Sequence, residues 1–122
     1  MPTALIVEDT ATERQILTAC AQKAGLTVLT AGSVEEAIAQ ISHKKPDIVI
    51  LDVVLPGRSG FELCRELKGD AATSHIPVII CSTKGSDMDK FWGMKQGANA
   101  YIPKPVDQEE LIRTMKQLVA VS

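Results

Sequence analysis

The sequence has few aromatic residues and few cysteines, and it contains no long apolar run. Aromatic side chains make up 3% of the 122 residues, and no stretch approaches the roughly 20 apolar residues of a membrane span. The three cysteines, Cys20, Cys64 and Cys81, lie far apart, without the close pairing of zinc or redox motifs. We therefore expect reduced, mostly buried thiols and a protein that does not insert into membranes.

An excess of charge of one sign is also lacking, because 13 basic and 15 acidic residues leave a net charge of −2. Such a balance supplies no general attraction to nucleic acid or to an anionic membrane. Residues Met1 to Thr3 lead directly into an apolar strand pattern rather than into a charged and then hydrophobic export signal. The expected location is the cytoplasm, and nucleic acid is not an expected partner.

Length and composition predict a single domain over residues 1–122. A chain of this length with 45% apolar residues is ordinary for a protein with one buried core. No internal repeat, low-complexity segment or linker divides it. Any signal that the domain sends must therefore come from its own surface.

Five short runs rich in β-branched residues alternate with helical patterns. The runs are Ala4 to Val7, Thr27 to Ala31, Asp47 to Leu51, Val78 to Cys81 and Ala100 to Pro103. The middle runs are apolar throughout, as expected of strands that are buried on both faces. The alternation predicts an α/β fold, a doubly wound parallel sheet covered by helices on both sides.

Capping and exit signals mark the helices between these strands. Ser33 and Glu36 have capping-box spacing, Gly25 permits a left-handed exit from the first helix, and Asp107 can cap the last helix while Glu110 reaches back. Helical spacing predicts that the following residues face inward: Ile16, Leu17, Cys20, Ala24, Ala37, Ile38, Ile41, Phe61, Leu63, Cys64, Leu67, Met88, Phe91, Met94, Leu111, Met115 and Leu118.

Polar side chains follow four of the five strands, at the edge where parallel strands end and ligands bind. Glu8 and Asp9 come after the first strand and Asp52 after the third, whereas Ser82 and Thr83 follow the fourth and Lys104 the fifth. Each residue alone could be a cap, a loop residue or a solvated charge. Their shared placement indicates a functional site.

Three neighbouring carboxylates repel one another unless a cation neutralises them. A site of oxygen ligands with room for water suits Mg²⁺, and Mn²⁺ could replace it. A carboxylate such as Asp52 can also attack phosphorus, and phosphoryl transfer needs mainly positioning and charge neutralisation. Lys104 could supply part of that neutralisation and Ser82 a hydrogen bond.

The motifs LIVEDT, DIVILDVVLPGRSGFE, PVIICSTKGS and GANAYIPKP resemble, in order and spacing, those of response-regulator receiver domains. The resemblance covers essentially the whole chain. It implies a flavodoxin-like (βα)5 fold with strand order 2-1-3-4-5. It also implies a phosphoacceptor in two-component signalling rather than an enzyme with a separate substrate, one that at most catalyses its own phosphorylation and dephosphorylation.

The resemblance assigns roles to individual residues. Asp52 is similar to the phosphoacceptor, and Asp9 and Asp52 to direct Mg²⁺ ligands. Glu8 would act through water, and Val54 would lend its backbone carbonyl to the metal. Lys104 matches the lysine that the family places in the site, with a cis Lys104-Pro105 peptide.

The same resemblance implies a switch from Ser82 to Tyr101. Ser82, where threonine is common, keeps the hydroxyl that turns toward the phosphoryl group, and Tyr101 would swing inward in response. A half-buried ring with a solvated hydroxyl is the simpler alternative for Tyr101. Trp92, displaced by about 100° from Phe91, is expected on the helix flank, on the same side as Tyr101 and the fifth helix, as part of a partner-binding surface formed by the fourth helix, the fifth strand and the fifth helix.

The segment DKFWGMKQGANAYIPKP is especially similar to CheA-dependent, single-domain CheY-like regulators of type IV pilus twitching or phototaxis. This narrower resemblance implies a CheA-like or other sensor histidine kinase, or its phosphotransfer domain, as phosphodonor. The response would be a change in motility through contact with an effector protein that the sequence does not identify.

Three alternatives differ in what they need near Asp52. A haloacid-dehalogenase-like phosphatase needs a second acid two residues later, where Val54 stands, and a Rossmann domain needs a glycine-rich turn where Glu8 and Asp9 stand. A third alternative, a phosphorylation-independent interaction module of receiver fold, remains open.

The residues beside Asp52 also predict how long a phosphoryl group would last. Val54 cannot orient an attacking water by hydrogen bonding, and Lys84 lies on the other flank of the site. We therefore expect a slowly hydrolysed phosphorylated state.

Overall fold

Ten elements alternate along the chain, and the computed structural model describes residues 1–119. The strands are β1 (Thr3–Val7), β2 (Thr27–Ala31), β3 (Ile48–Leu51), β4 (Val78–Ser82) and β5 (Ala100–Pro103). The helices are α1 (Ala11–Lys23), α2 (Val34–His43), α3 (Gly60–Gly69), α4 (Asp87–Lys95) and α5 (Gln108–Leu118). The strand bounds lie within one residue of the ranges that the sequence predicts.

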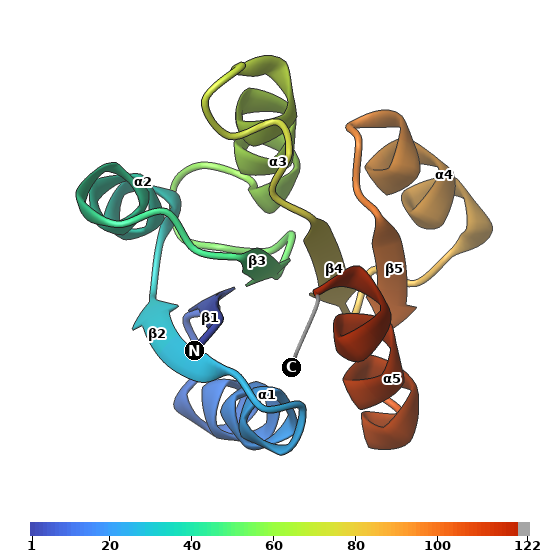
Figure 1. The fold of residues 1–122 in the computed structure, drawn as a ribbon. Coiled ribbons are helices and arrows are strands. Elements are labelled where there is room, and N and C mark those ends of the chain that lie inside the picture. Colours follow the sequence, from blue (N-terminus) through green and yellow to red (C-terminus); the bar gives the residue numbers. More distant parts are fainter. Residues whose placement is uncertain (120–122) are drawn as a thin grey trace.

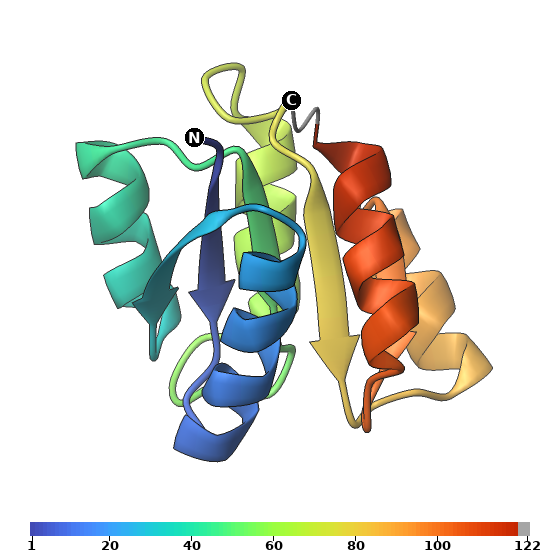
Figure 2. The same ribbon diagram turned by 60° about the horizontal axis from the view of Figure 1, so that its bottom comes forward.

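All five strands are parallel and form one sheet in the order β2-β1-β3-β4-β5. Figure 1 shows α1 and α5 on one face of this sheet and α2, α3 and α4 on the other. Figure 2 shows that the strands point the same way, so their carboxyl ends meet at one edge. The predicted α/β architecture and strand order are confirmed.

Two buried clusters hold the helices to the sheet, one on each face. Side chains alternate along each central strand, so Leu5 and Val7 of β1 join the cluster under α2 and α3, whereas Ile6 joins the cluster under α1 and α5. Strands β1, β3 and β4 are buried along their whole length. Because these strands are covered on both faces, their apolar runs are continuous.

Local signals form most of the expected caps. Ser33 accepts a hydrogen bond from the Glu36 amide, but Glu36 reaches the amide of Gly32 rather than that of Ser33. Asp107 accepts from the Glu110 amide, without the predicted return bond within the described residues. Gly25 has the expected left-handed backbone, with φ of 87°.

The three cysteines are free and buried, as predicted. Burial raises the pKa of the Cys64 thiol to about 11. A thiol with such a pKa is almost entirely protonated near neutral pH, and only the thiolate is a strong nucleophile. The cysteines therefore act as small core residues.

Helix α4 faces the opposite way from the prediction. Met88, Phe91 and Met94 were expected in the core, but they are 76%, 54% and 47% exposed. The buried residue of α4 is Gly93, which packs against the Tyr101 ring. At about 100° per residue, Trp92 and these three apolar side chains fall within an arc of roughly 160° on the side away from Gly93.

The inward prediction was wrong for Ile38, and partly wrong for three other residues. Ile38 is 36% exposed and lines a hollow between α2 and α3, because its neighbours Ala37 and Ile41 take the face turned to the sheet. Phe61 and Leu118 are half-buried at the margins of the two clusters, and Ile16 is half-buried on α1. In the described part of the chain, no helix is both long and apolar enough to cross a membrane.

Candidate functional site

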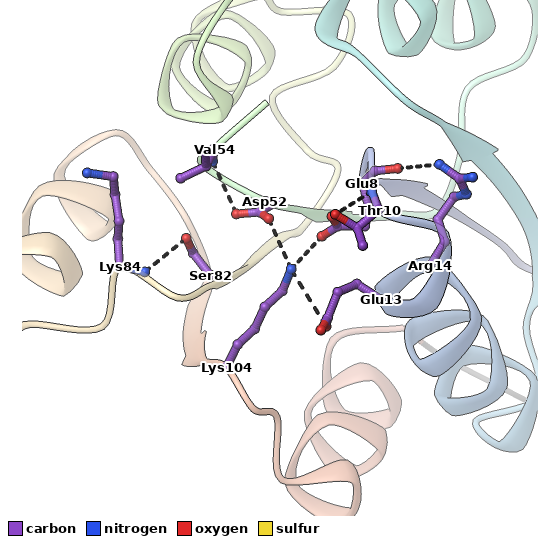
Figure 3. Close-up of polar contacts among 9 residues, drawn as sticks. All are labelled: Glu8, Thr10, Glu13, Arg14, Asp52, Val54, Ser82, Lys84 and Lys104. Carbon is purple, nitrogen blue, oxygen red and sulfur yellow. Dashed lines mark hydrogen bonds and ion pairs between the residues drawn. The ribbon is translucent and has the colours of Figure 1, made fainter. Parts of the chain in front are cut away.

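The carboxyl edge of the sheet brings together residues from four loops that are far apart in sequence. Glu8 follows β1, Asp52 follows β3, Ser82 ends β4 and Lys104 follows β5. Because β1, β3, β4 and β5 are consecutive neighbours in the sheet, their ends form a continuous row. Figure 3 shows the Lys104 side chain extending along this row toward Asp52 and Glu8.

The Lys104 ammonium bridges the two buried carboxylates. Its Nζ donates to Glu8 Oε2 at 2.5 Å and to Asp52 Oδ2 at 3.0 Å. The exposed fractions of the three side chains are 5% for Lys104, 1% for Glu8 and 9% for Asp52. Mutual pairing is what makes burial of three charged groups tolerable here.

Burial and pairing act in opposite directions on these groups. Burial raises the pKa of Glu8, and the hydrogen bond from Lys104 only partly offsets that rise. Burial by itself lowers the pKa of Lys104, but its hydrogen bonds to Glu8 and Asp52 outweigh burial and leave the pKa raised. Lys104 is therefore a permanent cation at the site near neutral pH.

The second oxygen of Asp52 is held by backbone. Its Oδ1 accepts from the Val54 amide at 3.1 Å, so one oxygen faces the following loop while the other faces Lys104. The Asp52 amide donates to the carbonyl of Val7, which ties the loop to β1. These bonds orient the carboxylate at the end of β3.

Gly60 allows the loop after β3 to close tightly over this site. A Cβ at Gly60 would lie 1.9 Å from the carbonyl oxygen of Asp52, so any side chain would displace the backbone that carries the carboxylate. The Gly60 amide also donates to the Val53 carbonyl at 3.0 Å. The sequence did not predict this role of Gly60, because a close backbone approach leaves no local signal.

The predicted metal-binding residues are only partly gathered. Glu8 and Asp52 share Lys104, whereas Asp9 is exposed at the surface. No group of three His, Cys, Asp or Glu side chains among residues 1–119 is arranged to hold a metal ion. Val54 presents its amide to Asp52, and the role of its carbonyl stays a prediction.

The donor chemistry nevertheless fits a hard divalent cation. The residues available are carboxylates and a backbone carbonyl, which are oxygen ligands of the kind Mg²⁺ prefers. A cation already bridges Glu8 and Asp52 in the form of the Lys104 ammonium. A metal at these oxygens would therefore have to compete with the Lys104 ammonium for them.

One residue joins the two predicted switch side chains. The Lys84 amide donates to Ser82 Oγ at 3.2 Å, and the Lys84 carbonyl accepts from the Tyr101 hydroxyl. Ser82 is buried, and Tyr101 is half-buried with a raised pKa caused mainly by burial. The loop after β4 thus contacts both hydroxyls through the backbone of one residue, Lys84.

Two further residues at the site were not singled out from sequence. Arg14 Nη1 donates to the Glu8 carbonyl at 2.9 Å, and Glu13 Oε2 lies 3.8 Å from Lys104 Nζ. Both belong to the first turns of α1, which starts at the same edge as the site (Figure 3). Their position soon after Asp9 is a signal that could have identified them.

Comparison with known proteins finds similarity to response regulators along nearly the whole chain. Residues 4–116 match the family model of the response regulator receiver domain. The chain is 47% identical over 116 residues to protein PilH of Pseudomonas aeruginosa, covering 95% of this chain and 96% of PilH. It is 40% identical over 117 residues to the phosphate regulon transcriptional regulatory protein PhoB of the same species, and spans about half of PhoB, 51%.

Solved structures agree in fold. The chemotaxis response regulator CheY4 of Vibrio cholerae is 29% identical, with a TM-score of 0.88 over 98% of this chain and 99% of CheY4. The signal receiver domain of a DNA-binding response regulator from Colwellia psychrerythraea is 28% identical, with a TM-score of 0.92 over 99% of this chain and 100% of that chain. With its strand order and its Asp52–Lys104 pair, the chain belongs to the response regulator receiver domains of two-component signalling.

Proposed function

We propose that Asp52 accepts a phosphoryl group from a histidine kinase or its phosphotransfer domain, and that the resulting state is read by a protein partner. The supporting observation is the contact of Asp52 Oδ2 with Lys104 Nζ at 3.0 Å, at the carboxyl end of β3. A paired, oriented carboxylate at a sheet edge is suited to attack phosphorus. The domain is a phosphoacceptor and has no separate substrate.

In the proposed transfer, an Asp52 oxygen forms a bond to the phosphorus of a phosphohistidine. The P–N bond breaks, and its electron pair returns to the imidazole nitrogen of the donor. Lys104 is close enough to Asp52 to neutralise part of the charge on the transferring oxygens. Ser82, at the end of the neighbouring strand, can donate its hydroxyl to one of them.

Mg²⁺ would be held by Glu8, Asp9, Asp52 and the carbonyl of Val54, with Mn²⁺ as a substitute. When bound, the metal supplies charge neutralisation at the phosphoryl oxygens. Asp9, exposed beside the buried Glu8, would have to turn toward Asp52 to take part. Thr10 and Lys104 hold the two Glu8 oxygens by hydrogen bonds of 3.2 Å and 2.5 Å.

The proposed output begins at Ser82. If its hydroxyl turns to a phosphoryl oxygen, it gives up the bond from the Lys84 amide, and the loop that also holds the Tyr101 hydroxyl is free to shift. Phosphorylation can shift the loop only if the phosphoryl group contacts one of two loop conformations better than the other. The shared Lys84 backbone supports this route from Ser82 to Tyr101.

The partner surface that we propose is the outward face of α4, defined by Met88, Phe91, Trp92 and Met94. All four side chains are at least 47% exposed, and large exposed apolar patches commonly mark interaction sites. Gly93, on the opposite side of α4, lies against the Tyr101 ring, so a movement of Tyr101 would reach this face by shifting the helix. Tyr101 and Trp92 are the two residues expected to report the state to a partner.

The pathway is proposed to be motility or taxis. The segment from Asp89 to Pro105 resembles regulators of type IV pilus twitching or phototaxis, and PilH is similar along nearly the whole chain. A CheA-like kinase would then be the phosphodonor in the cytoplasm. An effector protein, rather than nucleic acid, would receive the signal.

Hydrolysis of the phosphorylated state should be slow. Val54, two residues after Asp52, is 50% exposed and has no polar group that could orient water. Its amide is already bonded to Asp52 Oδ1. A half-life of seconds for the purified phosphorylated protein would contradict this expectation.

The test is intact mass after incubation with acetyl phosphate, with and without Mg²⁺, alongside Asp52→Asn. Gain of one phosphoryl group only with Mg²⁺ and only with Asp52 present is the expected result. Asp87→Asn, which makes the same change at an exposed aspartate in the first turn of α4, is a control that should still gain the group. No gain with acetyl phosphate or with phosphoramidate would favour the alternative, a phosphorylation-independent interaction module.

A further inference from the structure

The ammonium of Lys104 lies near a third carboxylate that the family resemblance does not assign. Glu13 Oε2 is 3.8 Å from Lys104 Nζ, and the Glu13 side chain is 34% exposed. Glu8 and Asp52, the other two partners, are almost fully buried. Figure 3 shows Glu13 approaching Lys104 from α1, on a different side from Asp52.

The distances rank the three carboxylates. A lysine ammonium has three N–H donors, and here two hydrogen bonds go to Glu8 at 2.5 Å and to Asp52 at 3.0 Å. Glu13, at 3.8 Å, is within ion-pair range but beyond hydrogen-bond range. Glu13 thus lies next to Lys104 but accepts no hydrogen bond from it.

Glu8 and Asp52 are also the oxygens that a divalent cation would need. Lys104 would then have to release at least one of them, and a buried ammonium without an anionic partner is costly. The ion pairs of Lys104 in residues 1–119 are with Glu8, Asp52 and Glu13, which leaves Glu13 as the carboxylate outside the metal set. The long lysine stem allows the small movement that would turn this ion pair into a hydrogen bond.

We propose that Glu13 is a positioning residue: it receives the Lys104 ammonium when Mg²⁺, held by Asp52 and through water by Glu8, competes with that ammonium, and it thereby strengthens Mg²⁺ binding. The inference rests on the metal site of the proposed function and adds a role for α1 in it. Arg14, the neighbouring cation, is engaged with the Glu8 carbonyl at 2.9 Å. Glu13 therefore acts through Lys104.

The test is Mg²⁺ binding to the purified protein by isothermal titration calorimetry. Glu13→Gln should weaken binding about 2- to 5-fold, the size expected for loss of a partly exposed charge contact. Glu35→Gln, at an exposed glutamate in the first turn of α2, removes the same charge and should change binding less than about twofold.

A double-mutant cycle separates a role through Lys104 from the general electric field of a carboxylate. In a Lys104→Met background, Glu13→Gln should have less than about a twofold effect, because the ammonium that it receives is gone. An equal effect in both backgrounds, or none in either, would overturn the proposal.

A second variant keeps the test decisive if Lys104→Met does not fold. Glu13→Asp keeps the charge but shortens the side chain by one methylene group. If Glu13 must reach Lys104, this variant should resemble Glu13→Gln; if it binds Mg²⁺ like the unmodified protein, the proposal fails. Absence of Mg²⁺ binding by the unmodified protein would instead refute the metal site of the proposed function and this inference with it.

Discussion

Helices α4 and α5 flank the same edge strand, β5, but they use their apolar residues in opposite ways. Helix α5 buries Leu111 and Met115 completely, whereas α4 buries Gly93 and leaves Phe91 54% exposed. Spacing explains part of the difference. Residues four and then three apart stay on one helix face, but repeated steps of three fall back by about 60° each time.

The contrast teaches that apolar content does not by itself tell which face of a helix packs. Helix α4 approaches the sheet through its smallest residue, because Gly93 leaves room for the Tyr101 ring and Ile80. Its larger apolar side chains are then left outside. Helix α5 is thus held by buried apolar side chains, whereas the exposed apolar face of α4 is the surface proposed for partner binding.

The largest effect should come from the packed face of α5. Leu111→Ala removes a side chain that is 0% exposed and leaves a cavity between α5 and the sheet. The free energy of unfolding should fall by about 2–5 kcal/mol. Urea unfolding followed by circular dichroism measures it, and a loss below about 1 kcal/mol would show that α5 is no better packed than α4.

A smaller loss is expected where α4 meets the sheet. Gly93→Ala puts a Cβ 2.6 Å from the Tyr101 ring, so the ring or the helix must shift. The clash should cost about 1–3 kcal/mol, of which roughly 1 kcal/mol is recovered through helix propensity.

The matched control is Gly69→Ala in α3, where a Cβ would meet nothing within 4 Å. It should be neutral or stabilising by up to about 1 kcal/mol. Thermal unfolding of both variants is the measurement. Equal effects at Gly93 and Gly69 would mean that the α4 contact with Tyr101 is loose.

The start of α4 should depend on its cap. Ser86 Oγ accepts from the Asp89 amide while the Asp89 carboxylate accepts from the Ser86 amide, which makes a complete capping box. Ser86→Ala should lower the free energy of unfolding by about 1 kcal/mol. Urea unfolding with Ser42→Ala, an exposed serine late in α2, as a neutral control would check it.

The smallest effect should come from the exposed face of α4. Phe91→Ala loses an exposed ring and its contact with Lys95 Nζ, which lies 5.6 Å from the ring centre. The free energy of unfolding should change by less than about 1 kcal/mol. A loss as large as that of Leu111→Ala would show that this face is packed in solution and would argue against a binding role.

The position of a residue at the end of a strand predicted part of the site. Asp52, Glu8 and Lys104 were predicted to converge because parallel strands end at one edge, and their ion pairs confirm the convergence. Asp9 was expected beside them but is exposed. Adjacent residues point in different directions, so a pair such as Glu8 and Asp9 cannot be assigned to one site from order alone.

By itself, the sequence determined the alternation of strands and helices, because β-branched runs, caps and glycines act locally, and the resemblance of its motifs gave the family and, through the family, the strand order. Only the tertiary structure decided which face of α4 packs, that Gly60 must lack a side chain, and that Glu13 lies 3.8 Å from Lys104. These features depend on distances between segments far apart along the chain. Such distances arise when the helices pack on the sheet, and no local pattern records them.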